Sequence, residues 1–281
     1  MIGLFDSGHG GLTVYESLSR RFPDYNFLYL GDHANAPYGN RSSEEIFDLT
    51  RTGVEVLFQR GCRLVILACN TATAIAGRKL QQEWLPSSTW DQHNVLGIIA
   101  PTVEAATQTP WAVTTPQYPQ KYNDDLIAIY ATNRTVQSNV FVEEIHKRCP
   151  NVRIVQQSCP ELAGAIESGA LTEELDELVK YYITCSIENA EGIAPNKAIL
   201  GCTHYPLVEN LFQKHLPQST RLLSQPVIVA DSLEDYLVRH PYYVTGTNAI
   251  APEFLTTGDA LRVTDALVSS WKKELLFKAV Q

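Results

Sequence analysis

Two of the six cysteines, Cys69 and Cys202, stand in matched surroundings. Each follows a short apolar run and precedes two polar residues, in segments 64–71 and 198–204. A thiol at the start of a helix has a lowered pKa, and its thiolate is the reactive form. A single cysteine at a strand end is more often a small core residue, but two in matched contexts favour a function. The other four lack this context and are interpreted as structural: Cys62, Cys149, Cys159 and Cys185.

Two thiols that face one molecule from opposite sides suit the inversion of a carbon stereocentre. A thiolate on one side removes a proton and a thiol on the other side delivers one, so each sulfur is a base in one direction and an acid in the other. The α-hydrogen of an amino acid is weakly acidic, and fixed donors must therefore stabilise the developing carbanion. Such a reaction needs no cofactor. No lysine with a phosphate-binding loop stands out as a pyridoxal phosphate site.

Apolar runs alternate with longer amphipathic stretches, which is typical of βαβ units and a mainly parallel sheet. The expected strands are residues 2–5, 27–30, 64–68, 95–99, 126–130, 152–155, 198–200 and 227–229. Helices are expected over 42–61, which opens with a capping box, and over 172–192. In open α/β sheets, ligands bind beyond the carboxyl ends of the strands, which is where Cys69 and Cys202 stand.

Two halves of the chain repeat the same order of features on either side of residues 101–125. That segment is rich in Pro, Thr and Gln and predicts a loop or linker. Segment 64–71 corresponds to 198–204, and 2–7 corresponds to 127–132. We therefore predict an α/β fold of two pseudo-symmetric domains with mainly parallel sheets and an active site in the cleft between them.

Composition excludes several classes of protein. The 281 residues are 44% hydrophobic and carry 31 acidic against 22 basic side chains, a formal charge of -9. Nucleic acid and anionic membranes are therefore not expected as main partners. The apolar runs are too short to span a bilayer, and the amino-terminal segment lacks the features of a signal peptide, so a cytoplasmic location is expected. The cysteines fit no metal-ligand spacing, so no metal is expected.

A glycine-rich segment follows Asp6, with Gly8, Gly10 and Gly11. Its spacing is not the dinucleotide fingerprint, so we do not predict a nucleotide site there. By residue type alone, Asp6 fits a helix cap or turn former as well as a catalytic carboxylate.

Four longer motifs resemble those of the glutamate racemase family. They are FDSGHGGLT at 5–13, GD with PYG within 31–39, ACNTA at 68–72 and GCTHYPL at 201–207. The similarity runs nearly end to end and includes the segments 159–169 and 256–259. This resemblance implies racemisation of L-glutamate to D-glutamate without pyridoxal phosphate, as a bacterial supply of D-glutamate for peptidoglycan.

The resemblance also assigns roles to residues. It implies that Cys69 and Cys202 are the two acid–base thiols, with Asp6 tuning the first and His204 the second. It implies substrate contacts from eight residues around these strand ends: Asp6, Ser7, Tyr38, Gly39, Asn70, Thr71, Thr203 and His204. Two acidic residues match positions proposed to assist catalysis in the family: Asp32 and Glu167.

The resemblance implies a discontinuous first domain, which the carboxyl-terminal segment completes. We expect residues 1–98 plus 211–281 to form this domain and residues 99–210 to form the second. It further implies a homodimer that uses glutamate as its substrate and needs no cofactor.

Three residues depart from the usual family pattern: His9, His33 and Asn35. Other functions also remain open at this stage. The same machinery could racemise aspartate, although the pair Thr203 and His204 favours glutamate within the family. A binding or regulatory protein with this fold is a second alternative, but binding alone does not require two matched thiols. A thiol oxidoreductase or cysteine hydrolase is a third, which the absence of a CxxC pair disfavours.

Overall fold

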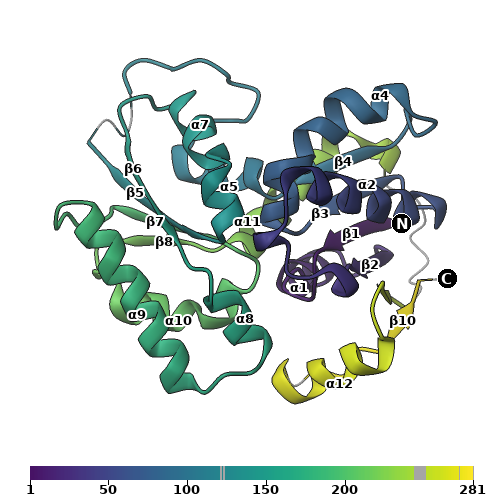
Figure 1. Cartoon of the computed structure of the whole chain (residues 1–281). Coiled ribbons are helices and arrows are strands. Elements are labelled where there is room, and N and C mark those ends of the chain that lie inside the picture. The colour runs from purple at the N-terminus through teal and green to yellow at the C-terminus, as the bar shows by residue number, and fades with distance from the viewer. Residues whose placement is uncertain (121, 123, 244–250, 272, 281) are drawn as a thin grey trace.

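Two separate parallel sheets form the framework of the molecule (Figure 1). A computed structural model describes residues 1–120, 122, 124–243, 251–271 and 273–280. The larger sheet has the strand order β10-β9-β2-β1-β3-β4 and the smaller one β6-β5-β7-β8, and every described strand pair is parallel. The predicted α/β class with two mainly parallel sheets is confirmed.

The strands are short and mostly buried. In the larger sheet they are β1 Ile2–Asp6, β2 Phe27–Gly31, β3 Leu64–Leu67, β4 Asn94–Gly97, β9 Glu253–Thr256 and β10 Phe277–Ala279. In the smaller sheet they are β5 Leu126–Ala131, β6 Arg153–Ser158, β7 Lys197–Gly201 and β8 Arg221–Leu223.

Helices connect the strands. They are α1 Leu12–Arg21, α2 Ser43–Gln59, α3 Asn70–Ala72, α4 Leu85–Ser87, α5 Ile99–Thr107, α6 Asn133–Gln137, α7 Val140–His146, α8 Leu162–Glu167, α9 Thr172–Asn189, α10 Glu209–His215, α11 Gln225–Arg239 and α12 Ala260–Trp271. Two π-helical segments, Thr73–Gly77 and Leu80–Trp84, lie between α3 and α4. Short 3-10 turns occur at His33–Asn35, Tyr38–Asn40, Tyr205–Val208 and Pro241–Tyr243.

The two sheets share one topology. The order β2-β1-β3-β4 in the larger sheet corresponds strand for strand to β6-β5-β7-β8 in the smaller one. Cys69 follows β3 and Cys202 follows β7, so the two cysteines occupy equivalent positions in the repeat. Strands β9 and β10 extend the larger sheet beside β2 and have no counterpart in the smaller one.

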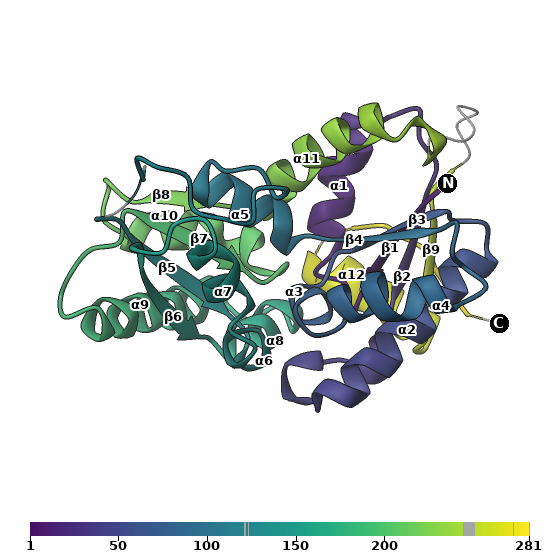
Figure 2. The same cartoon turned by 90° about the horizontal axis from the view of Figure 1, so that it is seen from above.

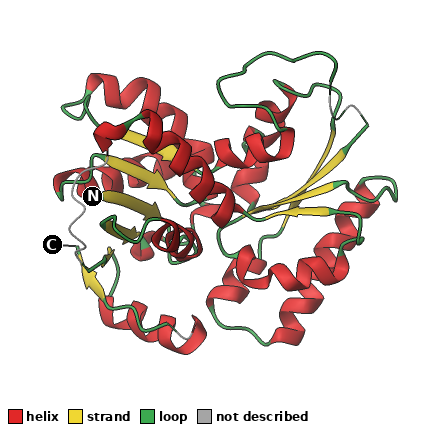
Figure 3. Cartoon of the chain, turned by 180° about the vertical axis from the view of Figure 1, so that it is seen from behind, coloured by secondary structure: helices red, strands yellow, loops and turns green. Residues whose placement is uncertain are grey.

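Helices cover both faces of each sheet (Figures 2 and 3). In the larger sheet, alternate residues pack against α1, α11 and α12 on one face and against α2 on the other. In the smaller sheet, one face packs on α9 and α10 and the other on α5 and α7. Strands buried on both faces explain the nearly continuous apolar runs in the sequence.

The capping box predicted at the start of α2 is present. The Ser42 side chain accepts a hydrogen bond from the Glu45 backbone N–H, and the Glu45 carboxylate accepts one from the Ser42 backbone N–H. Just past the end of the helix, Gly61 has a φ of 91°, a conformation that favours glycine. The predicted helix 172–192 is also observed, as α9, and Gly192 follows it in the same left-handed region.

Two expectations are wrong. Residues 227–229 lie inside α11, because Val229, Leu233 and Leu237 recur at helical spacing and are buried together on one face. The segment 101–125 is a loop only from residue 108, since its first part belongs to α5. The prediction also missed β8, β9 and β10, which are only three or four residues long.

The chain crosses between the sheets twice. It leaves the larger sheet through β4 and α5, and it returns from β8 into α11, which lies beside α1 (Figure 2). Strand β8 pairs with β7, although the sequence prediction assigned residues 211–281 to the first domain. We propose a division near Ser224. Among the described helices, none is long and apolar enough to cross a membrane.

Candidate active site

Residues from the carboxyl ends of both sheets meet where the two halves contact each other. Asp6 ends β1, and Thr203 follows β7 in the other half. The Thr203 hydroxyl lies 3.3 Å from the Asp6 carboxylate and is placed to donate to it, and the Thr13 hydroxyl donates to the Thr203 carbonyl at 2.9 Å. These contacts bring the surroundings of the two cysteines into one site.

Cys69 is buried at the start of the helical segment that follows β3. Its sulfur accepts a hydrogen bond from the Ala72 backbone N–H at 3.4 Å and lies 3.5 Å from the Ser7 hydroxyl. Burial, together with the nearby Asp6 carboxylate, raises the pKa of the Cys69 thiol to about 12. The lowered pKa that the sequence suggested for this position is therefore not found, because burial outweighs the two hydrogen bonds to the sulfur.

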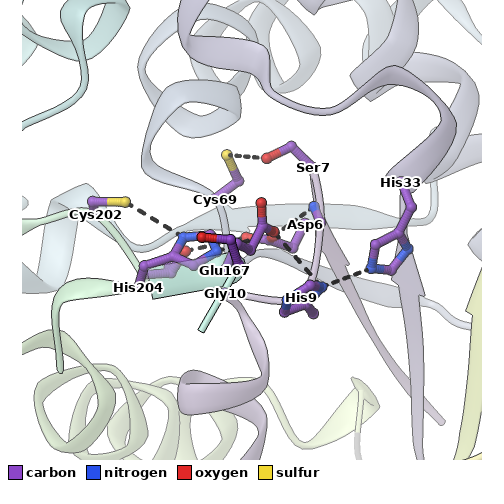
Figure 4. A network of polar contacts seen from close by, with 12 residues as sticks. Asp6, Ser7, His9, Gly10, His33, Cys69, Glu167, Cys202 and His204 are labelled. Carbon is purple, nitrogen blue, oxygen red and sulfur yellow. Dashed lines mark hydrogen bonds and ion pairs between the residues drawn. The ribbon is translucent and has the colours of Figure 1, made fainter. Parts of the chain in front are cut away.

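Cys202 begins a chain of acid–base groups. Its sulfur lies 3.7 Å from Nδ1 of His204, and Nε2 of His204 lies 3.2 Å from the Glu167 carboxylate (Figure 4). Burial opposes charge on both partners, yet the Glu167 carboxylate raises the pKa of His204 well above its usual value. Burial likewise opposes the charge on Glu167, but His204, His9 and His33 lower its pKa to about 2. The geometry favours an ion pair.

Two glycines of the loop after β1 make room for this ion pair. A Cβ atom at Gly10 would lie 2.5 Å from the His204 ring and 2.6 Å from the Thr203 hydroxyl. A Cβ atom at Gly8 would lie 2.7 Å from the Glu167 carboxylate. Gly8 and Gly10, for which the sequence did not predict a nucleotide site, thus allow the two halves to approach each other closely.

Asp6 is buried under the same loop. Its carboxylate accepts a hydrogen bond from the Gly8 backbone N–H at 2.8 Å. Burial raises the pKa of Asp6 to about 6, against the opposing influence of His204. The hydrogen bonds of this carboxylate run to the backbone of Gly8 and Gly11 and to the Thr203 hydroxyl, and Asp6 influences the Cys69 thiol through its charge.

Asp32 holds the turn that contains Tyr38 and Gly39. Its carboxylate accepts hydrogen bonds from the Tyr38 hydroxyl at 2.6 Å, from the Thr257 hydroxyl at 2.5 Å and from the Asn35 amide at 2.9 Å. Asn35, one of the departures from the family pattern, thus helps to hold this carboxylate. Burial and the Asp32 carboxylate both raise the pKa of Tyr38. A Cβ atom at Gly39 would lie 3.4 Å from Thr132 of the other half.

Asn70 and Thr71, which follow Cys69, are held by residues from elsewhere in the chain. The Asn70 amide pairs with the amide of Gln225 at 2.6 and 3.0 Å. The Thr71 hydroxyl lies 3.0 Å from that of Thr132 and 3.3 Å from that of Thr135. Sequence analysis missed Gln225, because the run that follows it resembled a strand.

The other two departures, His9 and His33, lie next to each other, and His9 lies between His33 and Glu167 (Figure 4). Nδ1 of His9 is 3.3 Å from Nε2 of His33 and 3.6 Å from the Glu167 carboxylate. Burial lowers the pKa of His9 to about 4 and also lowers that of His33. The ring of Trp271, at the end of α12, packs edge-on against the His9 ring, with 4.7 Å between the ring centroids. No sequence signal pointed to Trp271, since α12 is remote along the chain.

The remaining cysteines lie outside this site. Cys62, Cys149 and Cys159 are buried, Cys185 is half-buried, and all six cysteines are free thiols. Across the described ranges, no three His, Cys, Asp or Glu side chains are grouped so that they could hold a metal ion.

Solved structures of glutamate racemases share this fold. Glutamate racemase isoform RacE1 from Bacillus anthracis superimposes with a TM-score of 0.82 at 28% identity, over 100% of this chain and 97% of the other. A glutamate racemase from Francisella tularensis shares the fold, with a TM-score of 0.79 at 24% identity over 100% and 97%. The fold therefore places this protein in the class of α/β amino acid racemases.

Curated relatives are similar over the full length. The glutamate racemases of Phenylobacterium zucineum and of a Caulobacter species are each 45% identical, over 99% of both chains. This chain belongs to the glutamate racemase family. No family model matches the sequence.

Proposed function

We propose that this protein interconverts L- and D-glutamate without a cofactor, with Cys69 and Cys202 as the two acid–base groups. The observation that carries the proposal is that both thiols occupy equivalent strand ends of a pseudo-symmetric fold whose halves contact each other there. Family membership supports glutamate as the substrate. Its D-glutamate product would supply peptidoglycan synthesis.

The reaction is a proton exchange at the α-carbon. One cysteine, as thiolate, takes the α-proton, and the electron pair of the broken C–H bond stays on the substrate as a carbanion. The other cysteine then donates its thiol proton to the opposite face, which leaves it as a thiolate. Atoms and charge balance, and the roles of the two sulfurs reverse for the other enantiomer.

The surrounding residues support the two thiols in different ways. His204 is placed to exchange a proton with Cys202, and Glu167 holds that histidine in its charged form. Ser7 lies against the Cys69 sulfur. We propose that Ser7, Asn70, Thr71, Thr203 and His204 contact the substrate, where fixed donors oppose the build-up of negative charge. Tyr38 and Gly39 close the same site from the turn that Asp32 holds.

Exchange in deuterated buffer tests this function. Wild-type protein is expected to lose optical rotation from either enantiomer of glutamate and to place deuterium at the α-carbon, with no cofactor added. Aspartate is expected to react more slowly. Equal rates on aspartate would contradict a preference for glutamate, and tight glutamate binding without exchange would instead support a binding protein.

Single thiol replacements test the mechanism. Cys69→Ser and Cys202→Ser are each expected to lower the racemisation rate by about 10²- to 10⁴-fold, the usual contribution of a positioned acid or base. Cys185→Ser is the matched control, since Cys185 is half-buried in α9, a helix that carries none of the proposed site residues. Racemisation at the wild-type rate by either of the first two variants would contradict the two-thiol mechanism.

We propose that the protein acts in the cytoplasm, that it forms a homodimer, and that neither nucleic acid nor a membrane is its main partner. Light scattering of the purified protein measures the oligomeric state directly.

A further inference from the structure

The side chains of Asn70 and Gln225 form a complementary amide pair. Asn70 Nδ2 donates to Gln225 Oε1 at 2.6 Å, and Gln225 Nε2 donates back to Asn70 Oδ1 at 3.0 Å. Gln225 is fully buried and Asn70 nearly so. Each amide therefore satisfies one donor and one acceptor of the other inside the protein, where an unmatched polar atom is costly.

Thr102 fixes the orientation of both amides. Its hydroxyl donates to the Ile98 carbonyl at 2.7 Å, so its oxygen is free to accept from Gln225, at 2.9 Å. Only the nitrogen of the Gln225 amide can donate in this way. Since Nε2 is thereby oriented toward Thr102, Oε1 must face Asn70 Nδ2. The hydrogen-bond pattern then allows one arrangement of donors and acceptors.

Gln225 joins both crossings between the halves to the loop that carries Cys69. It is the first residue of α11, directly after the chain returns from β8. Its partners Ile98 and Thr102 lie where the chain leaves β4 for α5. Its third partner, Asn70, immediately follows Cys69. One buried side chain thus contacts the outgoing crossing, the returning crossing and the thiol-bearing loop.

We propose that Gln225 is a positioning residue, which couples the relative placement of the two halves to the placement of Cys69 through Asn70. The inference rests on the proposed function, because it assigns Cys69 a role in proton transfer. Asn70 Nδ2 gives one hydrogen to Gln225 and has a second one for the proposed contact with substrate. A displacement of about 1 Å at a reacting group can lower a rate about 10²-fold, so a loss of this pairing should appear in kcat.

Gln225→Glu tests the pairing without changing the size of the side chain. A protonated carboxyl group has one O–H donor and one carbonyl acceptor, so it can keep the two-way exchange with Asn70 and gives up only the bond to Thr102. A carboxylate has acceptors only, so it would oppose the Asn70 carbonyl oxygen and the Thr102 oxygen. The groups that contact Gln225 are amide, hydroxyl and carbonyl groups, all uncharged, and burial among them should raise the pKa of the new carboxyl group.

The expected result is a new dependence on pH. The ratio of kcat for Gln225→Glu to kcat for wild type should fall at least about 10-fold as pH rises through the pKa of the new carboxyl group, and it should recover at lower pH. The matched control is Gln59→Glu, an exposed glutamine at the end of α2, whose ratio should stay constant. Circular dichroism at each pH confirms that the compared proteins are folded.

Several results would overturn the proposal. A constant kcat ratio for Gln225→Glu across the pH range would show that the amide pattern does not matter, and a loss confined to KM would show that Cys69 is still in place. If Gln225→Glu unfolds at high pH, Gln225→Met replaces it at neutral pH, and a folded Gln225→Met protein with wild-type kcat also overturns the proposal. Failure of wild-type protein to racemise glutamate would instead contradict the proposed function itself.

Discussion

At the scale of single residues, charge is concentrated around Glu167. His204 and His9 both lie within 4 Å of one of its oxygens, and His33 contacts His9 from behind. The two histidines beside Glu167 differ in charge. The pKa of His204 is raised, so His204 is the charged partner of Glu167, whereas the pKa of His9 is lowered and His9 stays neutral. His33 Nδ1 lies 3.1 Å from the Gly31 carbonyl, which can only accept, so His33 Nε2 is left to accept from His9.

His9 should make folding sensitive to acid. Its pKa is about 4 in the folded protein against about 6.5 unfolded, so the unfolded chain binds more protons between these values. The free energy of unfolding therefore falls as pH decreases from 6.5 to 4, by up to about 1.4 kcal/mol per unit from this group. Urea titrations at several pH values measure the free energy of unfolding. This free energy should depend less steeply on pH for His9→Asn than for wild type. His240→Asn is the control, and an unchanged slope in His9→Asn would contradict the assignment.

At the scale of elements, the loop between β1 and α1 depends on glycine for close approach rather than for an unusual backbone. Gly10 lies against His204, and Gly8 lies against Glu167. The loop thus sets how near the first half can come to the ion pair of the second. A chain with side chains at these positions would keep both sheets but separate the two sets of site residues.

Gly10→Ala tests this loop. The added methyl group would lie 2.5 Å from the His204 ring, so the ring must shift away from Cys202 or Glu167. We expect kcat to fall about 10- to 100-fold, as for a misplaced catalytic group, with the far-ultraviolet circular dichroism unchanged.

The control for this loop is Gly164→Ala in α8. A Cβ atom there meets nothing within 4 Å, and alanine favours a helix by about 0.5–1 kcal/mol, so activity should persist and stability should rise. Wild-type activity in Gly10→Ala would show that the His204 position is not critical.

At the scale of the whole molecule, a second set of charges joins the halves away from the site. Glu144 of α7 contacts Arg148 and Lys147 in its own half and Arg78, from the helical segment after Cys69, in the other. Arg148 is 2% exposed and also donates to the Trp111 carbonyl, so the loop that begins at residue 108 is tied to the same cluster. Burial would oppose charge on Glu144, but Lys147 and Arg148 lower its pKa.

Removing this carboxylate should destabilise the protein. Glu144→Gln leaves Arg148 buried without its counter-charge, which typically costs about 3–5 kcal/mol of unfolding free energy. Denaturant titration measures the loss. Arg51→Ala, which removes the surface pairs of α2, is expected to cost less than about 1 kcal/mol. Equal losses in the two variants would contradict a buried role for Glu144.

Prediction from the sequence succeeded where the signal was local. Strand ends at Cys69 and Cys202, the capping box at Ser42 and the repeat between the two halves all follow from short stretches of side chains. It failed at α11, where three apolar residues in a row resembled a strand, and at β8 to β10, which are too short to show a period. The prediction of a loop over 101–107 was wrong for a related reason, because a proline is typical of loops but is also tolerated in the first turn of a helix.

By itself, the sequence determined the fold class, the repeat and the two thiols. Each of these follows from a short segment, in which a run of apolar residues marks a strand buried on both faces and the polar residues after it mark the strand end. Only the tertiary structure decided how the site is held together. Glu167 with His9, Asn70 with Gln225 and Trp271 with His9 are pairs more than 150 residues apart. Such pairs form only when the carboxyl ends of the two sheets come together, and this condition applies to the folded molecule as a whole.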